Sequence, residues 1–212
     1  MKTKEKTLIS LEHCGQLKKL CYNRSKMYEI EIKAHVNDRH KVQTILDSFA
    51  VYVGSCHKKD VYFKNNCNNL QIRIRDQENF SVQSTEPKKT ILVTYKRKER
   101  LKTDGTMEVN QEEEFTINNR ESFMVFLQDA GFVPVLEKEK KVSTWKYEHV
   151  LIEVCTIPLL GDFIEMEVLS ETKDKKTLEA IHNRFLLILK KCNISETEIE
   201  DKFYSELLAE KK

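Results

Sequence analysis

The sequence contains no apolar run that approaches the roughly 18–20 residues needed for a membrane-spanning helix, so no membrane association is expected. Residues 1–26 are Lys-rich and lack the uninterrupted apolar segment of a secretory signal, so we expect a cytoplasmic protein. No two of the six cysteines are spaced C-x-x-C, which favours reduced thiols over a disulfide framework or a thiolate metal site. A Walker-type glycine-rich loop is also missing, so any phosphate must be bound by side chains.

A clear excess of basic residues is missing as well. The 212 residues include 36 Lys and Arg against 34 Asp and Glu, a formal net charge of +2, and this balance predicts no nucleic-acid partner. Charged residues nevertheless make up 33% of the chain, above the usual quarter or so, and their placement therefore needs an explanation. The length and the 40% hydrophobic content fit one domain, which we place at residues 27–212, preceded by a variable N-terminal arm at 1–26.

Apolar and charged residues alternate along residues 28–33, 70–75 and 112–117, the pattern of strands that bury one face. Further strands are predicted at 51–53, 60–63, 91–96, 133–145, 150–156 and 163–169. Polar stretches at 76–89 and 97–108 are predicted to be loops. About eight strands are implied.

Helix signals occur between these strands. Asn37 or Asp38 is expected to cap a first helix, and Asn119 a second one that ends at Gly131. A long third helix follows the last strand. The residues expected to face inward are Val42, Ile45, Leu46 and Phe49 in the first helix, Phe123, Phe126, Leu127 and Ala130 in the second, and Leu178, Ile181, Phe185, Ile188 and Leu189 in the third.

Ser195-x-x-Glu198 has the spacing of a capping box and predicts a final short helix that contains Tyr204, Leu207 and Leu208. Three or four helices with mostly antiparallel strands make an α+β protein.

Three strands each carry two carboxylates two residues apart, which places both on one face about 7 Å from each other. These pairs are Glu29/Glu31, Glu112/Glu114 and Glu165/Glu167, and other strands carry Arg73/Arg75, Lys96 and Lys138/Lys140. For a single strand, a solvent-exposed charged face is the simplest explanation. Repetition over many strands instead favours a closed sheet with its charges inside. Divalent cations and a multiply charged anion would neutralise such an interior.

Seven motifs in order resemble one known family. They are Glu29-Ile30-Glu31-Ile32-Lys33, Asp60-Val61-Tyr62-Phe63, Ile72-Arg73-Ile74-Arg75, Thr94-Tyr95-Lys96, Glu112-x-Glu114 with the later Gly131-Phe132, Leu160-Gly161-Asp162-Phe163-Ile164-Glu165-Met166-Glu167, and Tyr204-Ser205-Glu206-Leu207-Leu208. Together they resemble the CYTH proteins, the class IV adenylyl cyclases and thiamine triphosphatases, which are also called triphosphate tunnel metalloenzymes.

The resemblance implies an eight-stranded antiparallel β-barrel (tunnel) with flanking helices, a small-molecule triphosphate or ATP as substrate, two Mg²⁺ or Mn²⁺ ions, and a homodimer. It implies metal positions at Glu29, Glu31, Glu112, Glu114, Glu165 and Glu167. It implies triphosphate-binding positions at Lys33, Arg73, Arg75, Lys96, Lys138 and Lys140. Lys33 is also the candidate catalytic base.

Two positions depart from the family pattern. Val142 stands where the family has an Arg, and Cys155 stands where it has an Asp. Lys138 or Lys141 could supply the positive charge that Val142 lacks. Glu153 is the carboxylate nearest in sequence to Cys155.

Three functions follow as hypotheses. The first is hydrolysis of an inorganic or organic triphosphate, and the second is cyclisation of ATP to cyclic AMP and pyrophosphate. The third is a binding module that holds a polyphosphate or nucleotide without turnover. We rank hydrolysis slightly above cyclisation.

Overall fold

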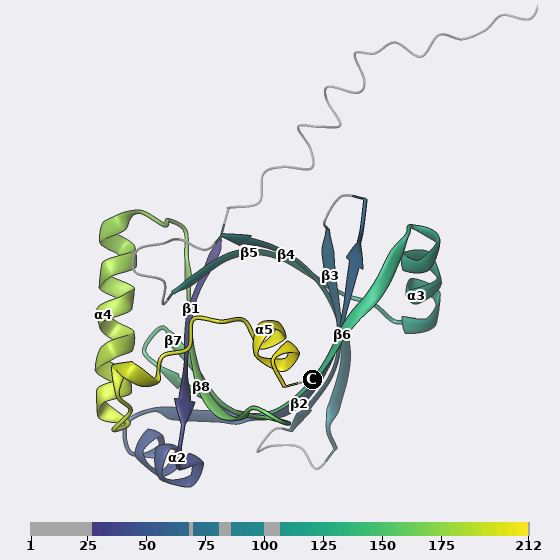
Figure 1. Ribbon diagram of the computed structural model, residues 1–212. Coiled ribbons are helices and arrows are strands. Elements are labelled where there is room, and N and C mark those ends of the chain that lie inside the picture. The colour runs from purple at the N-terminus through teal and green to yellow at the C-terminus, as the bar shows by residue number, and fades with distance from the viewer. Residues whose placement is uncertain (1–26, 68–69, 81–85, 100–106, 212) are drawn as a thin grey trace, which may run out of the picture.

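Eight antiparallel strands close into a barrel in the computed structural model, which describes residues 27–67, 70–80, 86–99 and 107–211. The strands are β1 (Tyr28–Val36), β2 (Val51–Asn65), β3 (Gln71–Phe80), β4 (Lys88–Glu99), β5 (Glu108–Thr116), β6 (Phe132–Tyr147), β7 (Val150–Ile157) and β8 (Gly161–Ser170). Their order around the barrel is β1-β5-β4-β3-β2-β6-β7-β8. Figure 1 looks into this barrel, and the predicted fold class is confirmed.

The pairing of β1 with β8 brings two distant motifs together. The register runs from Tyr28 opposite Ser170 to Val36 opposite Asp162. It places Glu31 opposite Glu167 and Lys33 opposite Glu165. Because side chains at alternate positions share a face, the acidic pairs of the two strands meet on the same side of the sheet.

Helices cover the outer face of the barrel (Figure 1). α2 (Arg39–Asp47) and α4 (Lys175–Lys191) pack over β1, β7 and β8, where the apolar halves of the alternating strands are buried, including Ile30 and Ile32. α3 (Arg120–Asp129) contributes the buried Leu127 to a second cluster on β2, β3 and β4. Each fully buried aliphatic side chain contributes about 1.5–3 kcal/mol to folding, so the apolar stripes fix which face of every strand points outward.

Several predicted boundaries need correction. Residues 51–53 and 60–63 belong to one continuous strand, β2, which bends at irregularities near Gly54 and Phe63. β3 runs on to Phe80 and β4 begins at Lys88, so most of the predicted loop at 76–89 that the structure describes is strand. Phe126 was expected to face inward, but it is 59% exposed, because Leu127 is the residue of α3 that reaches the core.

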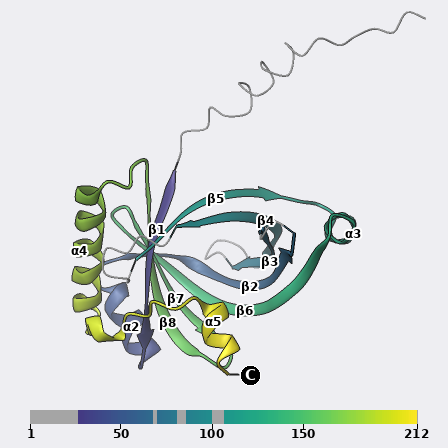
Figure 2. The ribbon, with the colours of Figure 1, turned by 45° about the horizontal axis from the view of Figure 1, so that its top comes forward.

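The C-terminal segment differs from the prediction too. Ser195 caps a short 3-10 turn, η1 (Glu196–Glu198), while the last helix, α5 (Tyr204–Ala209), begins six residues after η1 ends. Between them the chain is tied to β1, since the Glu200 amide donates to the Lys33 carbonyl at 2.9 Å. This tie places α5 across the end of the barrel (Figures 1 and 2).

No helix in the described ranges is both long and apolar enough to cross a membrane. The four cysteines that lie in these ranges are Cys56, Cys67, Cys155 and Cys192, and all are free thiols, as expected.

Candidate functional site

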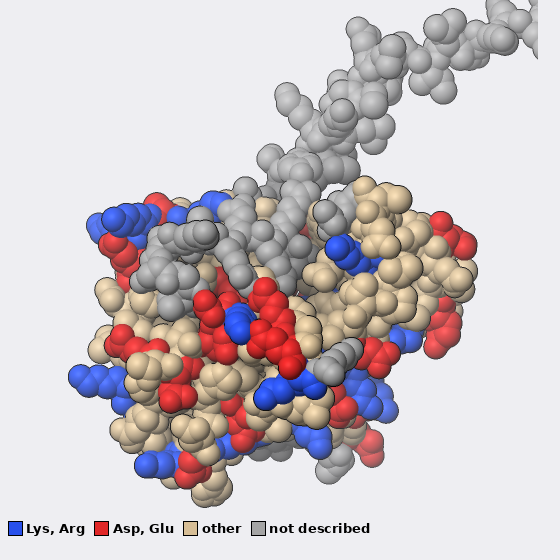
Figure 3. Space-filling view, in the orientation of Figure 1, with Lys and Arg blue, Asp and Glu red and all other residues tan. Residues whose placement is uncertain are grey.

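A cavity of about 490 Å³ occupies the interior of the barrel, and every one of the eight strands contributes to its lining. Among the described residues, the lining includes eight carboxylates, namely Glu29, Glu31, Glu108, Glu112, Glu114, Glu153, Glu165 and Glu167. It also includes six cations, namely Lys33, Lys58, Arg73, Arg75, Lys138 and Lys140. Figure 3 shows acidic and basic side chains gathered around the barrel end near α5, whereas the surface between this end and α3 is largely uncharged.

The predicted site residues converge on this one cavity. Eleven of the twelve sequence-predicted side chains line it. The twelfth is Lys96, which lies in β4 opposite Glu112 and whose side chain is outside the part that the structure describes. The structure therefore brings the acidic and basic motifs together, while their roles toward metal and phosphate stay predictions.

Asp60 organises the basic side of the cavity. Its carboxylate accepts from Arg75 Nε at 2.6 Å and from an Arg75 Nη at 3.0 Å, and Lys138 Nζ lies 3.4 Å away. Burial alone would raise the pKa of Asp60, but the attraction of Arg75 and Lys138 holds that pKa well below its ordinary value. The buried carboxylate therefore fixes two cations at the cavity wall.

Arg73 is held from the opposite side. One Nη donates to Thr94 Oγ1 at 2.9 Å, and the Thr94 hydroxyl donates to Glu114 at 3.0 Å. Glu112 and Glu114 lie 3.9 and 3.8 Å from the guanidinium. The Nε of Arg73 is buried and has no hydrogen-bond partner among the residues that the structure describes. Because a buried unpaired donor is costly, this N–H marks a place for an acceptor.

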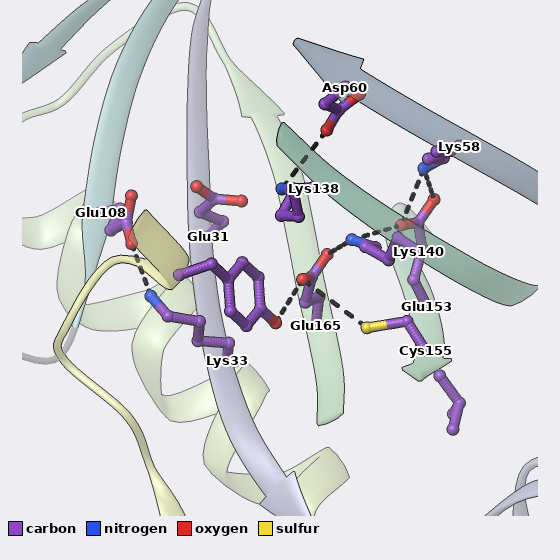
Figure 4. A network of polar contacts seen from close by, with 12 residues as sticks. Glu31, Lys33, Lys58, Asp60, Glu108, Lys138, Lys140, Glu153, Cys155 and Glu165 are labelled. Atoms are coloured by element: carbon purple, nitrogen blue, oxygen red, sulfur yellow. Dashed lines mark hydrogen bonds and ion pairs between the residues drawn. The ribbon is translucent and has the colours of Figure 1, made fainter. Parts of the chain in front are cut away.

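A chain of ion pairs crosses β2, β6, β7 and β8 (Figure 4). Lys58 Nζ donates to both oxygens of Glu153 at 2.7 and 2.9 Å, and Lys140 Nζ lies 3.3 Å from the same carboxylate. Lys140 also donates to Glu165. Burial lowers the pKa of Lys140, but the nearby carboxylates, with Glu165 first, outweigh it and raise that pKa well above its ordinary value.

Tyr204 of α5 inserts into this network. Its hydroxyl donates to Glu165 Oε1 at 2.5 Å, so both oxygens of Glu165 are engaged. The amino groups of Lys33, Lys138 and Lys140 lie 5.6, 5.1 and 5.9 Å from the centre of its ring. Three cations therefore lie within cation–π range of this ring.

Lys33, the last residue of the first motif, is buried and donates to Glu108 Oε1 at 2.6 Å. Its amino group also lies 5.8 Å from the centre of the Phe203 ring. Lys33 is thus held where β1 faces β5 and the C-terminal segment.

Carboxylates crowd one another on the acidic side. Burial, together with the charges of Glu31, Glu153 and Glu112, raises the pKa of Glu167 to about 7. Glu31 accepts from Asn110 at 3.1 Å. Within the described ranges, no three His, Cys, Asp or Glu side chains already surround a point as in a formed metal site. The carboxylates nevertheless suit hard divalent cations, because a cation would relieve their mutual repulsion.

The two departures from the family pattern turn out to be neighbours. Val142 in β6 lies opposite Cys155 in β7, and both are buried in an apolar cluster with Cys56 and Phe163. Burial raises the pKa of the Cys155 thiol to about 12, so it stays protonated, and the thiol donates to Glu165 Oε1 at 3.8 Å (Figure 4). Leu207 of α5 packs on this cluster, which closes part of the barrel end with apolar side chains.

Sequence reasoning missed four charged or phenolic groups that line or brace the cavity. They are Lys58, Asp60, Glu108 and Tyr204. Lys58 and Asp60 had a signal for their inward direction, since they alternate with outward-facing residues of β2. Glu153, named only as a substitute acid, lies at the centre of the ion-pair chain (Figure 4).

We predict that Asp60→Asn destabilises the protein by about 3–5 kcal/mol, because it leaves Arg75 and Lys138 buried without a countercharge. Asp76→Asn is a matched control on the adjacent β3, since Asp76 pairs with Arg120 in a partly exposed bridge and should cost about 1 kcal/mol at most. Urea unfolding at pH 7 measures both variants. Equal losses in the two would contradict the proposed role of Asp60.

A second prediction concerns pH. The pKa of Glu167 is raised on folding to about 7, so its stabilising contribution is present below the unfolded value of 4.5 and is lost as pH rises toward 7. Glu167→Gln should therefore be more stable than the wild type at pH 8, on the order of 3 kcal/mol from about 1.4 kcal/mol per pKa unit. The difference should shrink toward pH 4.5. Thermal unfolding of the metal-free protein and variant between pH 4.5 and pH 8 measures this difference. A Glu167→Gln variant that is less stable than the wild type at pH 8 would contradict the repulsion between Glu167 and its neighbouring carboxylates.

The comparisons with known proteins agree with this geometry. The family model described as the CYTH domain matches residues 27–204. The PH1819 protein of Pyrococcus horikoshii OT3 has a similar structure, with a TM-score of 0.72, 23% identity, and coverage of 87% of this chain and 99% of that one. A conserved hypothetical protein of Pyrococcus furiosus has a TM-score of 0.66 and 26% identity, and covers 84% of this chain and 99% of its own.

A third similar structure comes from Hippeastrum. That protein, provisionally assigned as an adenylyl cyclase and showing a dominant triphosphatase activity, has a TM-score of 0.55 and 12% identity, with coverage of 88% and 96%. No curated protein sequence matches the chain. Since the family model spans most of the 212 residues, the chain belongs to the CYTH domain family.

Proposed function

We propose that this protein is a metal-dependent phosphohydrolase that binds the phosphates of an inorganic or organic triphosphate inside the barrel. One observation carries the proposal. A buried cluster of cations held in place by Asp60 and Glu153 shares a single cavity with a cluster of crowded carboxylates. A polyphosphate and divalent cations have the charges that such a cavity lacks.

The phosphate side consists of Arg73, Arg75, Lys138 and Lys140, with Lys33 and Lys58 at its borders. Arginine suits this role because its planar fork donates two parallel hydrogen bonds to phosphate oxygens. The buried Nε of Arg73, which no described side chain or backbone group accepts from, supports an acceptor at this position. Lys96 stays a predicted member of this set.

The metal side is assigned to Glu31, Glu112 and Glu167, because the charges of the first two already raise the pKa of the third. Glu29 lines the same cavity, and Glu114 and Glu165 stay predicted ligands. A cation at Glu165 has to replace the contacts of Lys140 and Tyr204, whereas one at Glu167 relieves repulsion. Mg²⁺ or Mn²⁺ suits this oxygen-rich donor set, and two ions are proposed.

When bound, the ions supply charge neutralisation and a more acidic water for attack on phosphorus. The chain's own residues orient the phosphates and stabilise charge on the transferred phosphoryl group, chiefly through Arg73 and Arg75. Lys33 contacts Glu108 and lies at the border of the two sides, which suits phosphate orientation; its role as a catalytic base stays a prediction.

Hydrolysis ranks above cyclisation of ATP for two reasons. Hydrolysis places no demand on where a ribose lies, and the structurally similar Hippeastrum protein has a dominant triphosphatase activity. Binding without turnover is the remaining alternative, favoured by the apolar pair Val142 and Cys155 at positions where the family pattern is charged.

An activity assay separates these functions. The protein is incubated with Mg²⁺ or Mn²⁺ and, in separate reactions, with tripolyphosphate, thiamine triphosphate and ATP. We expect metal-dependent release of orthophosphate, which chelation with EDTA should abolish. Cyclic AMP with pyrophosphate would instead support cyclisation, and binding without any product would support the binding module.

We also predict that Arg73→Lys weakens tripolyphosphate binding roughly tenfold, because the variant keeps the charge but loses the second parallel hydrogen bond, worth about 1.5 kcal/mol. Calorimetric titration in the presence of Ca²⁺ measures affinity without relying on turnover. Arg120→Lys, outside the cavity in the bridge with Asp76, is the matched control and should bind like the wild type. Unchanged affinity in Arg73→Lys would exclude Arg73 from the phosphate site.

A further inference from the structure

A second, smaller cavity of about 230 Å³ lies beside the main one and is lined by residues of β2, β3, β6 and β7. Lys58 and Glu153 line both cavities, so their ion pair stands at the junction (Figure 4). Binding sites for whole drug-sized ligands usually measure about 300–1,000 Å³. The second cavity is therefore sized for one part of a ligand whose remainder lies in the main cavity.

The chemistry of the lining changes at this junction. Beyond Lys58 and Glu153, the described lining of the second cavity has no charged side chain and consists of Val53, Gly54, Ser55, Cys56, Gln77, Asn79, Phe80 and Thr144. A polyphosphate needs cations, so this part of the tunnel does not suit it. An uncharged group with hydrogen-bonding edges does, because Gln77 and Asn79 each carry an amide donor and an acceptor.

The strand β3 places these amides in line with Arg73 and Arg75, which are assigned to phosphate binding. Arg73, Arg75, Gln77 and Asn79 follow at two-residue steps along β3, so they share the face that lines the barrel interior. The Gln77 amide donates to Asn79 Oδ1 at 2.6 Å, which holds the two side chains together.

The other side of the cavity is built from one row of residues. Gly54 in β2 lies opposite Thr144 in β6, and Thr144 lies opposite Glu153 in β7. Gly54 has a φ of +153°, and a Cβ there would come within 2.8 Å of the Phe80 carbonyl oxygen, so only glycine permits this close approach of β2 and β3. The Thr144 hydroxyl thus lies in a wall whose shape the backbone fixes.

We propose that the second cavity binds the uncharged heterocyclic end of an organic triphosphate, such as a nucleobase, while the phosphates occupy the charged cavity. This inference rests on the proposed function. Lys58 binds the phosphate nearest the organic group. Gln77, Asn79 and Thr144 form hydrogen bonds with the polar edge of the heterocycle. The protein is thereby assigned a preference for organic triphosphates over tripolyphosphate.

The test compares two ligands on matched variants. Affinities for ATP and for tripolyphosphate are measured by calorimetry with Ca²⁺ on the full chain. Gln77→Leu should weaken ATP binding roughly three- to tenfold, as expected for one or two lost hydrogen bonds, and leave tripolyphosphate affinity within twofold. Thr144→Val, which keeps the side-chain volume, should act in the same direction and guards against a folding defect in the first variant.

Gln71→Leu is the matched control, because Gln71 lies on the same face of β3 at the other end of the main cavity. It should change the two affinities by the same factor. Selective loss of ATP binding in Gln71→Leu, with none in Gln77→Leu and Thr144→Val, would overturn the proposal and place the organic group at the opposite end. Wild-type binding of tripolyphosphate but not ATP would also overturn it, while the proposed function would stand. If neither ligand binds, both proposals fail.

Discussion

The network of buried ion pairs around Asp60 and Glu153 is the constraint on which the rest of the site depends. A closed barrel with helices packed on its outer face must turn the charged side of each strand inward, where an unpaired charge costs several kcal/mol. Asp60 compensates Arg75 and Lys138, and Glu153 compensates Lys58 and Lys140. The cations are thus fixed before any ligand arrives, so little ordering is left to oppose ligand binding.

The charged region has two different borders. Val142, Cys155 and Phe163 form a buried cluster against which Leu207 of α5 packs. Beyond Lys58, neutral amides replace charges, and Cys56 belongs both to this lining and to the buried cluster. The space beyond Lys58 can therefore contribute to substrate choice without contributing to the reaction.

Much of this was predictable from the sequence, because the two-residue period of the strands is strong. The pairs Glu29/Glu31, Arg73/Arg75 and Glu165/Glu167 indicated an inward charged face, and the structure places all of them on the cavity. The joining of residues 51–53 and 60–63 into β2 was missed, since charged residues between them hide the strand pattern. The bracing role of Asp60 and the insertion of Tyr204 depend on which strands and helices meet across the barrel, which no local pattern encodes.

The central claim is that the carboxylates and the cations of the barrel serve one ligand set together. The most direct measurement is the thermal unfolding midpoint of the protein with tripolyphosphate alone, with Mn²⁺ alone, and with both. Ligands that bind the folded state raise this midpoint by mass action. We predict that the rise in the midpoint with both ligands exceeds the sum of the separate rises. Each ligand neutralises like charges in the cavity whose repulsion opposes binding of the other ligand. A rise that is merely additive, or no rise with tripolyphosphate in either condition, would contradict the account.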